Sequence, residues 1–400
     1  MNIVWLTPEV PFPPIGGRNG VYNRIVQLSG NNDIYLFSIA YNAVEKGDTA
    51  EVQKYCKEVH FFDRSEKKVW SYLKSMFMPY SVASRFRKDI IEGILKIIEE
   101  KGVDIIIVDF PNMARNIIPV KKRYPDLPIT INQHNVEFVR MRDMEKIRTI
   151  PLYKRIAYYL ESLRLERYER KIYKSGLFDG ISFFSEDDCT FFENNIDTAN
   201  AKLQVIPLGA NDYGKKPLEL NNKTMLFVGR LDSIAITNVE AALWFTKEIL
   251  PLILRKVPDA KLILAGANPS EEVLNLQNEN IKVIPNFESL ESIYNTTDIV
   301  VIPLLSGGGV KGKLLEAVAF RKHIVTTSHG IEGTLFKKNE HLALAESAED
   351  FADECIKILN GMDQYKEREQ RAYQLFLSEY EWKSIGGKYF DFVKSIAFKN

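Results

Sequence analysis

A glycine-rich stretch in the last third of the chain combines the residue types that bind phosphate groups. Gly307, Gly308 and Gly309 are followed closely by Lys311 and Lys313. Glycine lets backbone N–H groups approach a ligand, and the start of a helix adds a partial positive charge. Such a terminus binds phosphate readily, and the two lysines would add cationic donors. We therefore predict that this stretch holds a nucleotide diphosphate.

The elements around the glycines fit a strand, a loop and a helix in a parallel sheet. The apolar run Ile299–Pro303 is too short to span a membrane and is bounded by turn residues, so it predicts a buried strand. A helix is expected at about Val310–Ala319 and a second strand at Ile324–Thr327. Apolar residues recur on one helix face, which predicts packing on the sheet. Glu316 lies off that face, near the loop.

Two known phosphate-binding patterns overlap this loop, and neither fits fully. Gly307, Gly309 and Gly312 satisfy G-x-G-x-x-G, with Glu332 about twenty residues further on. That dinucleotide fingerprint normally follows the first strand of its domain, whereas this loop comes after several strands. The stretch also approaches a P-loop, but Leu314 replaces the Ser or Thr that would hold Mg²⁺. A glycine turn needed only for strand-to-helix packing is the remaining alternative.

Three further polar residues each directly follow a predicted strand, namely His134, Arg230 and Asn286. Ligands of open α/β sheets bind beyond the carboxyl ends of the strands, so all three are candidates for substrate contact. Arg230 could pair with a phosphate through two hydrogen bonds, and Asn286 could line a base pocket. A surface arginine and a loop histidine that caps the next helix are the structural alternatives.

The amino terminus repeats the order of strand, glycine loop and helix. A strand at Ile3–Thr7 leads through a proline-rich segment to Gly16 and Gly17, and a helix pattern follows at Asn19–Leu28. This order suggests a second phosphate-facing loop, opposing the first. The alternative is a surface loop in which glycine and proline only make turns.

Strands alternate with helices in two series, which predicts an α/β protein with two doubly wound parallel sheets. Four hundred residues also exceed the usual size of a single core. We predict an amino-terminal domain at 1–206, a polar connector at 207–223, a carboxy-terminal domain at 224–378 and a final helix at 379–400 that packs back on the first domain. The two domains are expected to face each other across a cleft. The predicted strands are Ile3–Thr7, Ile34–Ile39, Val59–Phe62, Ile105–Asp109, Ile129–Gln133, Gly180–Ser185 and Leu203–Ile206, then Met225–Val228, Leu262–Ala265, Ile281–Ile284, Ile299–Pro303, Ile324–Thr327 and Leu342–Ala345.

Composition excludes several classes of protein. Acidic and basic residues balance at 53 each, so no net charge attracts nucleic acid. Three scattered cysteines without C-x-x-C spacing indicate a reducing compartment and no structural zinc. The amino terminus lacks the basic segment and long apolar core of a signal peptide, and no apolar run reaches membrane-spanning length. We expect a cytoplasmic protein, with peripheral contact at the inner membrane face as the alternative.

Two segments bear on that membrane alternative. Val69–Arg87 mixes aromatic, methionine and basic residues, so it predicts either an interfacial segment or one that packs on its own domain. Leu152–Tyr173 is a long helix in which Glu and Arg interleave at helical spacing. That pattern usually means a solvated face with ion pairs.

Taken together, the motifs resemble those of the retaining glycosyltransferases of the two-domain GT-B fold, the group 1 or family 4-like bacterial sugar transferases. The resemblance covers most of the chain and is sharpest from Met225 to Gly333. In the amino-terminal half it rests on Gly16-Gly17, the position of His134, the SED turn and IPLGAN. The motifs of the carboxy-terminal half, in chain order, are LFVGRLD, PDAKLILAG, TTDIVVIPLLSGGGVKGKLLEAVAF and TTSHGIEG.

The resemblance implies a role for each site residue. Glu316 matches the second glutamate of a paired-glutamate motif and would bind the nucleotide ribose, while Gly308 stands where many members have the first. Arg230 matches the arginine that binds the diphosphate. Ala235 replaces a lysine that often follows, so Lys313 is the candidate for the second cation.

The amino-terminal residues take roles in the same way. Gly16 and Gly17 resemble the loop that faces the donor phosphates. His134 resembles a histidine that contacts the donor sugar near the reacting carbon. The remaining donor-binding positions that we predict are Asn286, Gly307, Gly308, Gly309, Val310 and Leu315.

The activity implied is transfer of a hexose from a nucleotide-diphosphate sugar to a glycan, lipid-linked or other hydroxyl acceptor, with retention of configuration. Fixed cations and amides would stabilise the leaving diphosphate, and the departing phosphate itself would deprotonate the acceptor. No Asp-x-Asp lies in an apolar stretch, so we expect neither a metal nor another cofactor. A nucleotide-sugar epimerase, a non-catalytic nucleotide-binding protein and a dinucleotide oxidoreductase are the alternatives.

Overall fold

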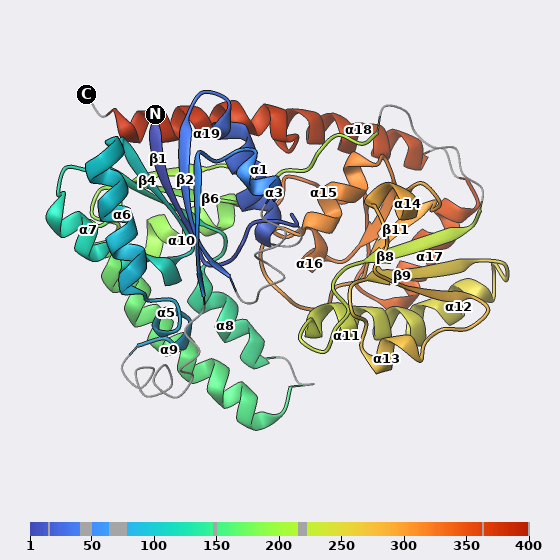
Figure 1. The fold of residues 1–400 in the computed structure, drawn as a ribbon. Coiled ribbons are helices and arrows are strands. Elements are labelled where there is room, and N and C mark those ends of the chain that lie inside the picture. Colours follow the sequence, from blue (N-terminus) through green and yellow to red (C-terminus); the bar gives the residue numbers. More distant parts are fainter. Residues whose placement is uncertain are drawn as a thin grey trace. The chain divides into compact units, whose positions relative to one another are not determined.

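The structure, a computed structural model, describes residues 1–14, 17–40, 50–63, 78–146, 150–214, 222–361 and 364–398. The chain forms two compact units, Met1–Pro207 with Ile385–Asn400 and Leu208–Ser384 (Figure 1). Each unit is built on a sheet whose strand pairs are all parallel, so the predicted α/β class is confirmed. Of the predicted connector at 207–223, residues 215–221 lie outside the described part of the chain.

The first unit holds a seven-stranded sheet in the order β3-β2-β1-β4-β5-β6-β7. Its central strands are apolar on both faces, and Ile3 to Leu6 are fully buried, as expected of a sheet covered by helices on both sides. Each strand predicted in this half is present. The strands are β1 (Asn2–Thr7), β2 (Asp33–Ala40), β3 (Glu58–Asp63), β4 (Ile105–Asp109), β5 (Ile129–Gln133), β6 (Gly180–Phe183) and β7 (Lys202–Val205).

The helices of the first unit turn an apolar face to this sheet. In α6 the buried residues Ile90, Ile94 and Ile97 follow helical spacing. The side chain of Ser185 caps α10 by accepting a hydrogen bond from the N–H of Asp188 at 3.2 Å. The described helices are α1 (Gly17–Ser29), α3 (Ala50–Gln53), α5 (Tyr80–Ala83), α6 (Lys88–Lys101), the 3-10 helix η1 (Pro111–Asn116), α7 (Ile118–Arg123), α8 (Glu137–Lys146), α9 (Leu152–Lys174) and α10 (Glu186–Asn195).

The second unit holds a six-stranded sheet in the order β10-β9-β8-β11-β12-β13, again with every predicted strand present. Its strands are β8 (Thr224–Val228), β9 (Lys261–Gly266), β10 (Ile281–Pro285), β11 (Ile299–Ile302), β12 (His323–Thr326) and β13 (Ala343–Leu344). Its helices are α11 (Ile236–Trp244), the π-helical turn η2 (Phe245–Ile249), α12 (Leu250–Leu254), α13 (Glu271–Leu274), α14 (Leu290–Tyr294), α15 (Gly312–Ala319), α16 (Ser328–Ile331), α17 (Ala348–Leu359) and α18 (Gln364–Glu379).

The helix after the glycine loop begins two residues later than predicted. Lys311 has extended backbone angles, φ −92° and ψ 107°, and is the N-cap residue that precedes α15. Gly309 has a φ of 79°, in the left-handed region that favours glycine. The chain therefore turns before it becomes helical, and the loop is longer than the sequence pattern indicated.

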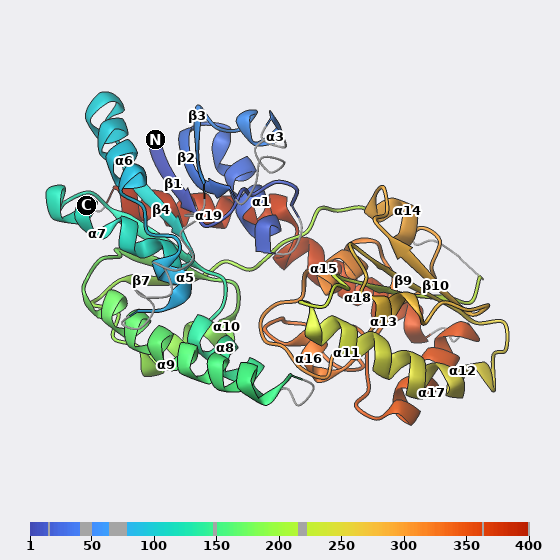
Figure 2. The same ribbon diagram turned by 60° about the horizontal axis from the view of Figure 1, so that its bottom comes forward.

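The last helix, α19 (Trp382–Ala397), packs on the first unit from Ile385 onward. The ring of Tyr389 lies 6.2 Å from that of Trp5, and its hydroxyl donates to Asn132 Oδ1 at 3.0 Å. Aromatic residues form the packing face, although Phe390 is only half-buried. The helix thus covers the sheet near β1, as Figure 2 also shows, and contacts β5 and β6.

The structure bears on the membrane expectation in two places. Residues 69–77 of the predicted interfacial segment lie outside the described part of the chain, and Tyr80–Ala83 form α5. Every helix among the described residues is too short or too polar to span a lipid bilayer.

Adding one methyl group to Gly180 tests the contact between β6 and α19. A Cβ atom there would lie 2.9 Å from Ile396 Cγ1 and from Phe392 Cζ, so we expect Gly180→Ala to destabilise the first unit by about 1–3 kcal/mol. Calorimetry should show a fall of several degrees in melting temperature. The control is Gly387→Ala in α19, where a Cβ atom meets nothing within 4 Å and alanine favours the helix. Equal melting temperatures for both variants would contradict the packing.

Candidate functional site

Lys313 and Arg230 meet around Asn238 at the carboxyl edge of the second sheet. The Lys313 ammonium donates to Asn238 Oδ1 at 2.7 Å and lies 4.3 Å from the centre of the Phe227 ring. The Asn238 amide in turn donates to the backbone oxygen of Arg230 at 2.9 Å. β8 and β11 are neighbours and parallel, so the loops that follow them converge, and two parts of the chain that are distant in sequence form one cluster.

This cluster needs the glycine that precedes Arg230. A Cβ atom on Gly229 would lie 2.8 Å from Lys313 Nζ and 3.0 Å from Asn238 Nδ2. Any side chain there would displace the ammonium or the amide. The sequence analysis did not single out Asn238 or Phe227 as site residues. A polar residue in the first turn of the largely apolar α11 was the available signal for Asn238.

Burial brings both charged groups of α15 toward neutrality. It lowers the pKa of the Lys313 ammonium to about 7, while the Glu316 carboxylate opposes the shift and Lys311 adds to it. Burial also raises the pKa of Glu316, against a hydrogen bond from Tyr294 and the charge of Lys313. A bound anion would restore the full charge of Lys313, because a negative neighbour favours the ammonium form.

Three stacked aromatic rings support Glu316. The Tyr294 hydroxyl donates to Glu316 Oε2 at 3.3 Å. The Tyr294 ring stacks on Phe320 at 4.5 Å, and Phe320 stacks on Tyr213 at 4.3 Å. Since planar stacking fixes the phenol, it also fixes the carboxylate that the phenol contacts. Glu316 lies off the buried face of α15, as predicted.

The glycine loop presents backbone donors. Gly307 and Gly309 have φ angles of 102° and 79°, which explains why glycine is needed at both positions. Within the described residues, no hydrogen bond leads from the N–H groups of Gly307, Gly308 or Gly309 to a protein acceptor. The loop is held from outside instead, because Lys311 donates to the oxygen of Gly309 and Ser306 donates to Glu240 on α11 at 3.3 Å.

In the first unit, His134 is fixed by a buried carboxylate. Its Nε2 atom lies 3.2 Å from Asp109 Oδ1, and its ring stacks on Phe110 at 3.9 Å. Asp109 also accepts hydrogen bonds from the Trp5 indole and from Asn132 Nδ2. The sequence pointed to His134 but not to Asp109, which ends the neighbouring strand β4.

A buried arginine links α1 to the same sheet. Arg24 donates to Ser182 Oγ at 3.2 Å and to the oxygen of Ile206 at 2.7 Å. Its guanidinium lies over the rings of Phe184 and Tyr389, at 4.5 and 4.7 Å from their centres. Burial lowers the pKa of this guanidinium. We assign it to packing, because its contacts are all to its own unit.

The other predicted positions lie as follows. Gly16 is outside the described residues, and Gly17 begins α1. Asn286 is exposed, with a φ of 56°, at the end of the edge strand β10. Val310 is half-buried in the loop. Leu315 is fully buried, so only its backbone is available to a ligand.

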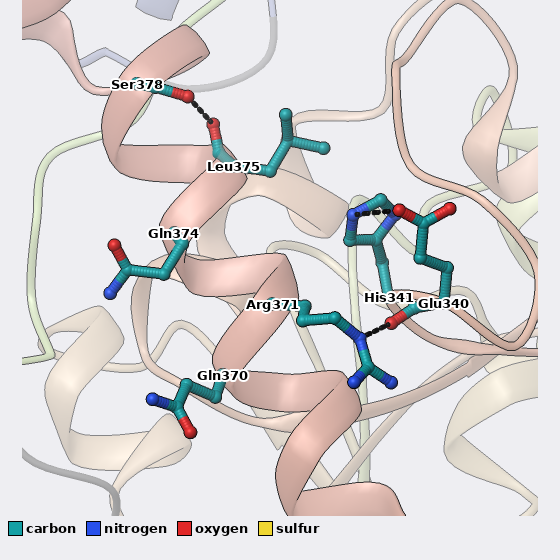
Figure 3. A pocket seen from close by; sticks show the side chains of 7 residues that line it. All are labelled: Glu340, His341, Gln370, Arg371, Gln374, Leu375 and Ser378. Carbon is teal, nitrogen blue, oxygen red and sulfur yellow. Dashed lines mark hydrogen bonds and ion pairs between the residues drawn. The ribbon is translucent and has the colours of Figure 1, made fainter.

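The pocket in Figure 3 belongs elsewhere on the second unit. It is a hollow of about 470 Å³ between α18 and the loop before β13, and none of the predicted site residues lines it. Arg371 donates to the oxygen of Glu340 at 2.8 Å, and His341 lies 3.6 Å from Glu340 Oε1. Among the described residues, no group of three His, Cys, Asp or Glu side chains is placed to hold a metal ion.

Solved structures define the class of the fold. A glycosyltransferase from Rickettsia africae aligns with a TM-score of 0.64 at 16% identity, over 100% of this chain and 99% of that one. Sucrose-phosphate synthase from Thermosynechococcus elongatus gives 0.69 at 12% identity, over 99% of both chains. HepE of Anabaena in complex with UDP gives 0.68 at 12% identity, over 99% of this chain and 100% of that one. The fold is therefore the two-domain GT-B fold of glycosyltransferases.

The sequence of the second unit resembles a known family. Residues 222–361 match the family Glycosyl transferases group 1, and they include Arg230, Asn238, Lys313 and Glu316. This match and the GT-B fold confirm the resemblance predicted from the motifs. An uncharacterised 44.6 kDa protein in the cps region of Klebsiella pneumoniae is 25% identical over 401 residues, 96% of this chain and 97% of that protein.

Replacing Glu316 by an uncharged residue of the same shape tests the electrostatics of the site. The pKa of Glu316 is raised from its ordinary 4.5, so the native state retains a proton that the unfolded chain has lost, and this group makes stability fall as pH rises above 4.5. We expect Glu316→Gln to raise the melting temperature at pH 7, because the neutral amide avoids the desolvation of an ionised carboxylate. The gain should shrink toward pH 4.5.

The control for this substitution is Glu288→Gln, at an exposed loop position of the same unit. It should leave the melting temperature unchanged at both pH values. A Glu316→Gln variant that melts below the unmodified protein at pH 7 would show that the carboxylate contributes to folding, contrary to our interpretation.

Proposed function

We propose that the chain is a retaining glycosyltransferase that moves a hexose from a nucleotide-diphosphate sugar to a hydroxyl acceptor, without a metal. One observation carries the proposal: three glycine N–H groups that have no acceptor among the described residues belong to the same unit as the Lys313–Asn238–Arg230 cluster. Backbone N–H donors and cationic side chains are the groups that bind a diphosphate.

The cations would act mainly on the leaving group. Departure of a nucleoside diphosphate builds negative charge on its oxygens, and donors fixed in advance lower that barrier by about 3 kcal/mol each. Arg230 is suited to this role because 59% of its side chain is exposed, while Asp232 holds its Nε atom. Lys313 is the second donor, and it gains charge as the anion binds.

Glu316 would accept hydrogen bonds from the ribose hydroxyls. Its raised pKa reflects desolvation of the carboxylate, which additional hydrogen-bond donors would offset. The Tyr294 hydroxyl donates to only one of its two oxygens. Gly308 stands where many members of the family have the first glutamate of the pair, so the backbone of the loop would take over the contact of that glutamate with the sugar. Asn286, Val310 and the backbone of Leu315 complete the proposed donor contacts.

His134 and Gly17 keep the roles that the resemblance implies, namely contact with the donor sugar and the donor phosphates. The hydrogen bond to Asp109 and the stack on Phe110 hold the His134 ring in one orientation, as a sugar contact needs. The acceptor hydroxyl would attack the sugar on the face from which the diphosphate leaves, and the departing phosphate would take its proton. Attack on this same face gives transfer with retention.

Two relatives support the donor and the setting. HepE of Anabaena has been solved with UDP and with UDP-glucose, and its fold is the one found here. The Klebsiella relative lies in a cps region. We therefore propose a nucleotide-sugar donor and a role in polysaccharide or glycoconjugate synthesis, with a glycan or lipid-linked acceptor.

Binding of nucleotide sugars tests the donor site. At a hundredfold excess over its Kd, the matching donor among UDP-, GDP- and ADP-sugars should stabilise the chain by about 2.7 kcal/mol. Arg230→Ala and Glu316→Ala should each weaken its binding about tenfold or more in calorimetry, since each removes a charged hydrogen-bonding partner. Arg255→Ala, at an exposed position of the same unit, should bind normally.

Unchanged affinity in both site variants would remove the proposed donor site. Incubation of the donor alone, followed by NMR, separates the remaining alternatives. Conversion of the sugar without an acceptor would indicate an epimerase. Transfer to an acceptor with the configuration retained is the outcome that we expect.

The pKa of Lys313 predicts that donor binding takes up a proton. In the free protein that pKa is about 7, and a bound diphosphate raises it toward the ordinary 10.5. Above pH 7 the Lys313 side chain is mostly a neutral amine in the free protein and must gain a proton on binding. The affinity should therefore fall by up to about tenfold per pH unit until the pKa of the complex is reached. Calorimetry at pH 8 in buffers of different ionisation enthalpy measures the proton.

A nucleotide sugar is the right ligand for this measurement, because its diphosphate has no ionisation near neutral pH. The control is Lys313→Arg, whose guanidinium stays charged throughout and should abolish the proton uptake. Equal proton uptake in both proteins would assign the proton to another group.

A further inference from the structure

Large apolar side chains are exposed mainly on one helix of the first unit. Of the eleven exposed large apolar side chains among the described residues, six lie on α9. Leu152 and Tyr153 are 68% and 70% exposed. Contiguous apolar exposure of this kind marks an interaction site more often than scattered single residues do. The six are Leu152, Tyr153, Ile156, Tyr159, Leu160 and Leu163.

These six side chains share one face of α9. Their spacing of three and four residues places them along the same side of the helix over about 18 Å. The opposite side carries the buried residues, among them Leu165 and Ile172, and α9 packs beside α8 (Figure 2). The exposed stripe is therefore not the core-facing side of the helix.

The same face continues as a basic row. Arg167, Lys171 and Lys174 follow Leu163 at spacings of four, four and three residues, and all three are exposed. We call the six apolar residues and these three the α9 outer face. The expected ion pairs of α9 are present, such as Arg170 with Glu166 at 2.9 Å, but the sequence analysis did not predict the apolar stripe.

The acidic residues of α9 are buried or partly buried, and two of them have partners. Glu161 accepts a hydrogen bond from the N–H of Tyr80 at 2.7 Å. Glu166 pairs with Arg142 at 2.8 Å, and Glu169 is fully buried. The exposed charged side chains of the helix are thus all cationic, and one of them, Lys174, pairs with Asp197 at 3.5 Å.

We propose that the α9 outer face docks on the surface of an anionic lipid bilayer. Leucine, isoleucine and tyrosine side chains are those that enter the headgroup region, where the tyrosine hydroxyl stays hydrated. The basic row complements the lipid phosphates at about 1 kcal/mol for each cation near the surface. The same face of a second copy would bring only the same apolar and cationic side chains, so a symmetric pairing through this face offers the row no complement.

This inference stands apart from the proposed donor site and from residues 69–87. It rests on described residues of α9 alone, and none of the proposed donor contacts lies on that helix. The two can therefore fail separately. A helix lying flat at the interface is also consistent with α9 being too polar to span a bilayer.

Vesicle flotation with the full chain tests the proposal. Vesicles of phosphatidylcholine with about one-third phosphatidylglycerol should bind the protein, phosphatidylcholine alone should bind it much less, and salt should weaken binding because exposed charges are screened. Leu152→Ser should lower the partition coefficient severalfold, since it removes an inserted side chain. Lys171→Glu should lower it through charge.

Matched controls lie on the second unit. Leu274→Ser changes an apolar residue that is 45% exposed, and Lys256→Glu changes an exposed lysine. Both should bind vesicles like the unmodified chain. Leu152→Ser and Lys171→Glu should also leave nucleotide-sugar affinity unchanged.

Several outcomes would overturn the proposal. One is absence of binding to either kind of vesicle, and another is an equal effect of the α9 and control variants. A fall in melting temperature for Leu152→Ser with vesicle binding intact would show that protein covers this face. A dimer that Leu152→Ser converts to a monomer, without vesicle binding, would assign the face to a second copy.

Discussion

The ammonium of Lys313 lies between an aromatic ring and an amide oxygen, and the candidate site of the second unit is arranged around it. Phe227 lies below the ammonium, Asn238 accepts its hydrogen bond, and Gly229 leaves the space that it occupies. Desolvation in this place costs the charged form enough to lower the pKa to about 7. An ammonium held in this way is stabilised strongly by an incoming anion, because attraction to the anion offsets the free energy of desolvation. We regard the desolvation of Lys313 as the physical basis of the site.

The geometry of a parallel sheet by itself brings such residues together. All carboxyl ends of its strands lie at one edge, so loops from different parts of the chain meet there. The second unit uses the loops after β8 and β11, which carry Arg230 and the glycines. The first unit uses the same geometry for a different purpose, because the ends of β4 and β5 place Asp109 beside His134.

Residues with strong local signals were found from the sequence, whereas their partners were not. His134, Arg230 and the three glycines follow apolar strands, and that position alone marks them. Asp109 also ends a strand, but an aspartate there is too common a feature to stand out. Tyr213 and Tyr294 resemble ordinary core aromatics in the sequence, and only their stacking on Phe320 reveals a support for Glu316.

The sequence by itself determined the two parallel sheets, the strands that form them and the loops that carry polar residues, because hydrophobic periodicity and glycine placement are local properties. Only the tertiary structure decided which polar groups share a site, how far burial shifts the pKa values of Lys313 and Glu316, and which side of α9 faces solvent. Those depend on contacts between residues far apart in the chain. In α9 the pattern of charges predicted a polar solvated face, whereas the structure also exposes an apolar stripe. Helical spacing alone does not say which side of the helix the core will cover.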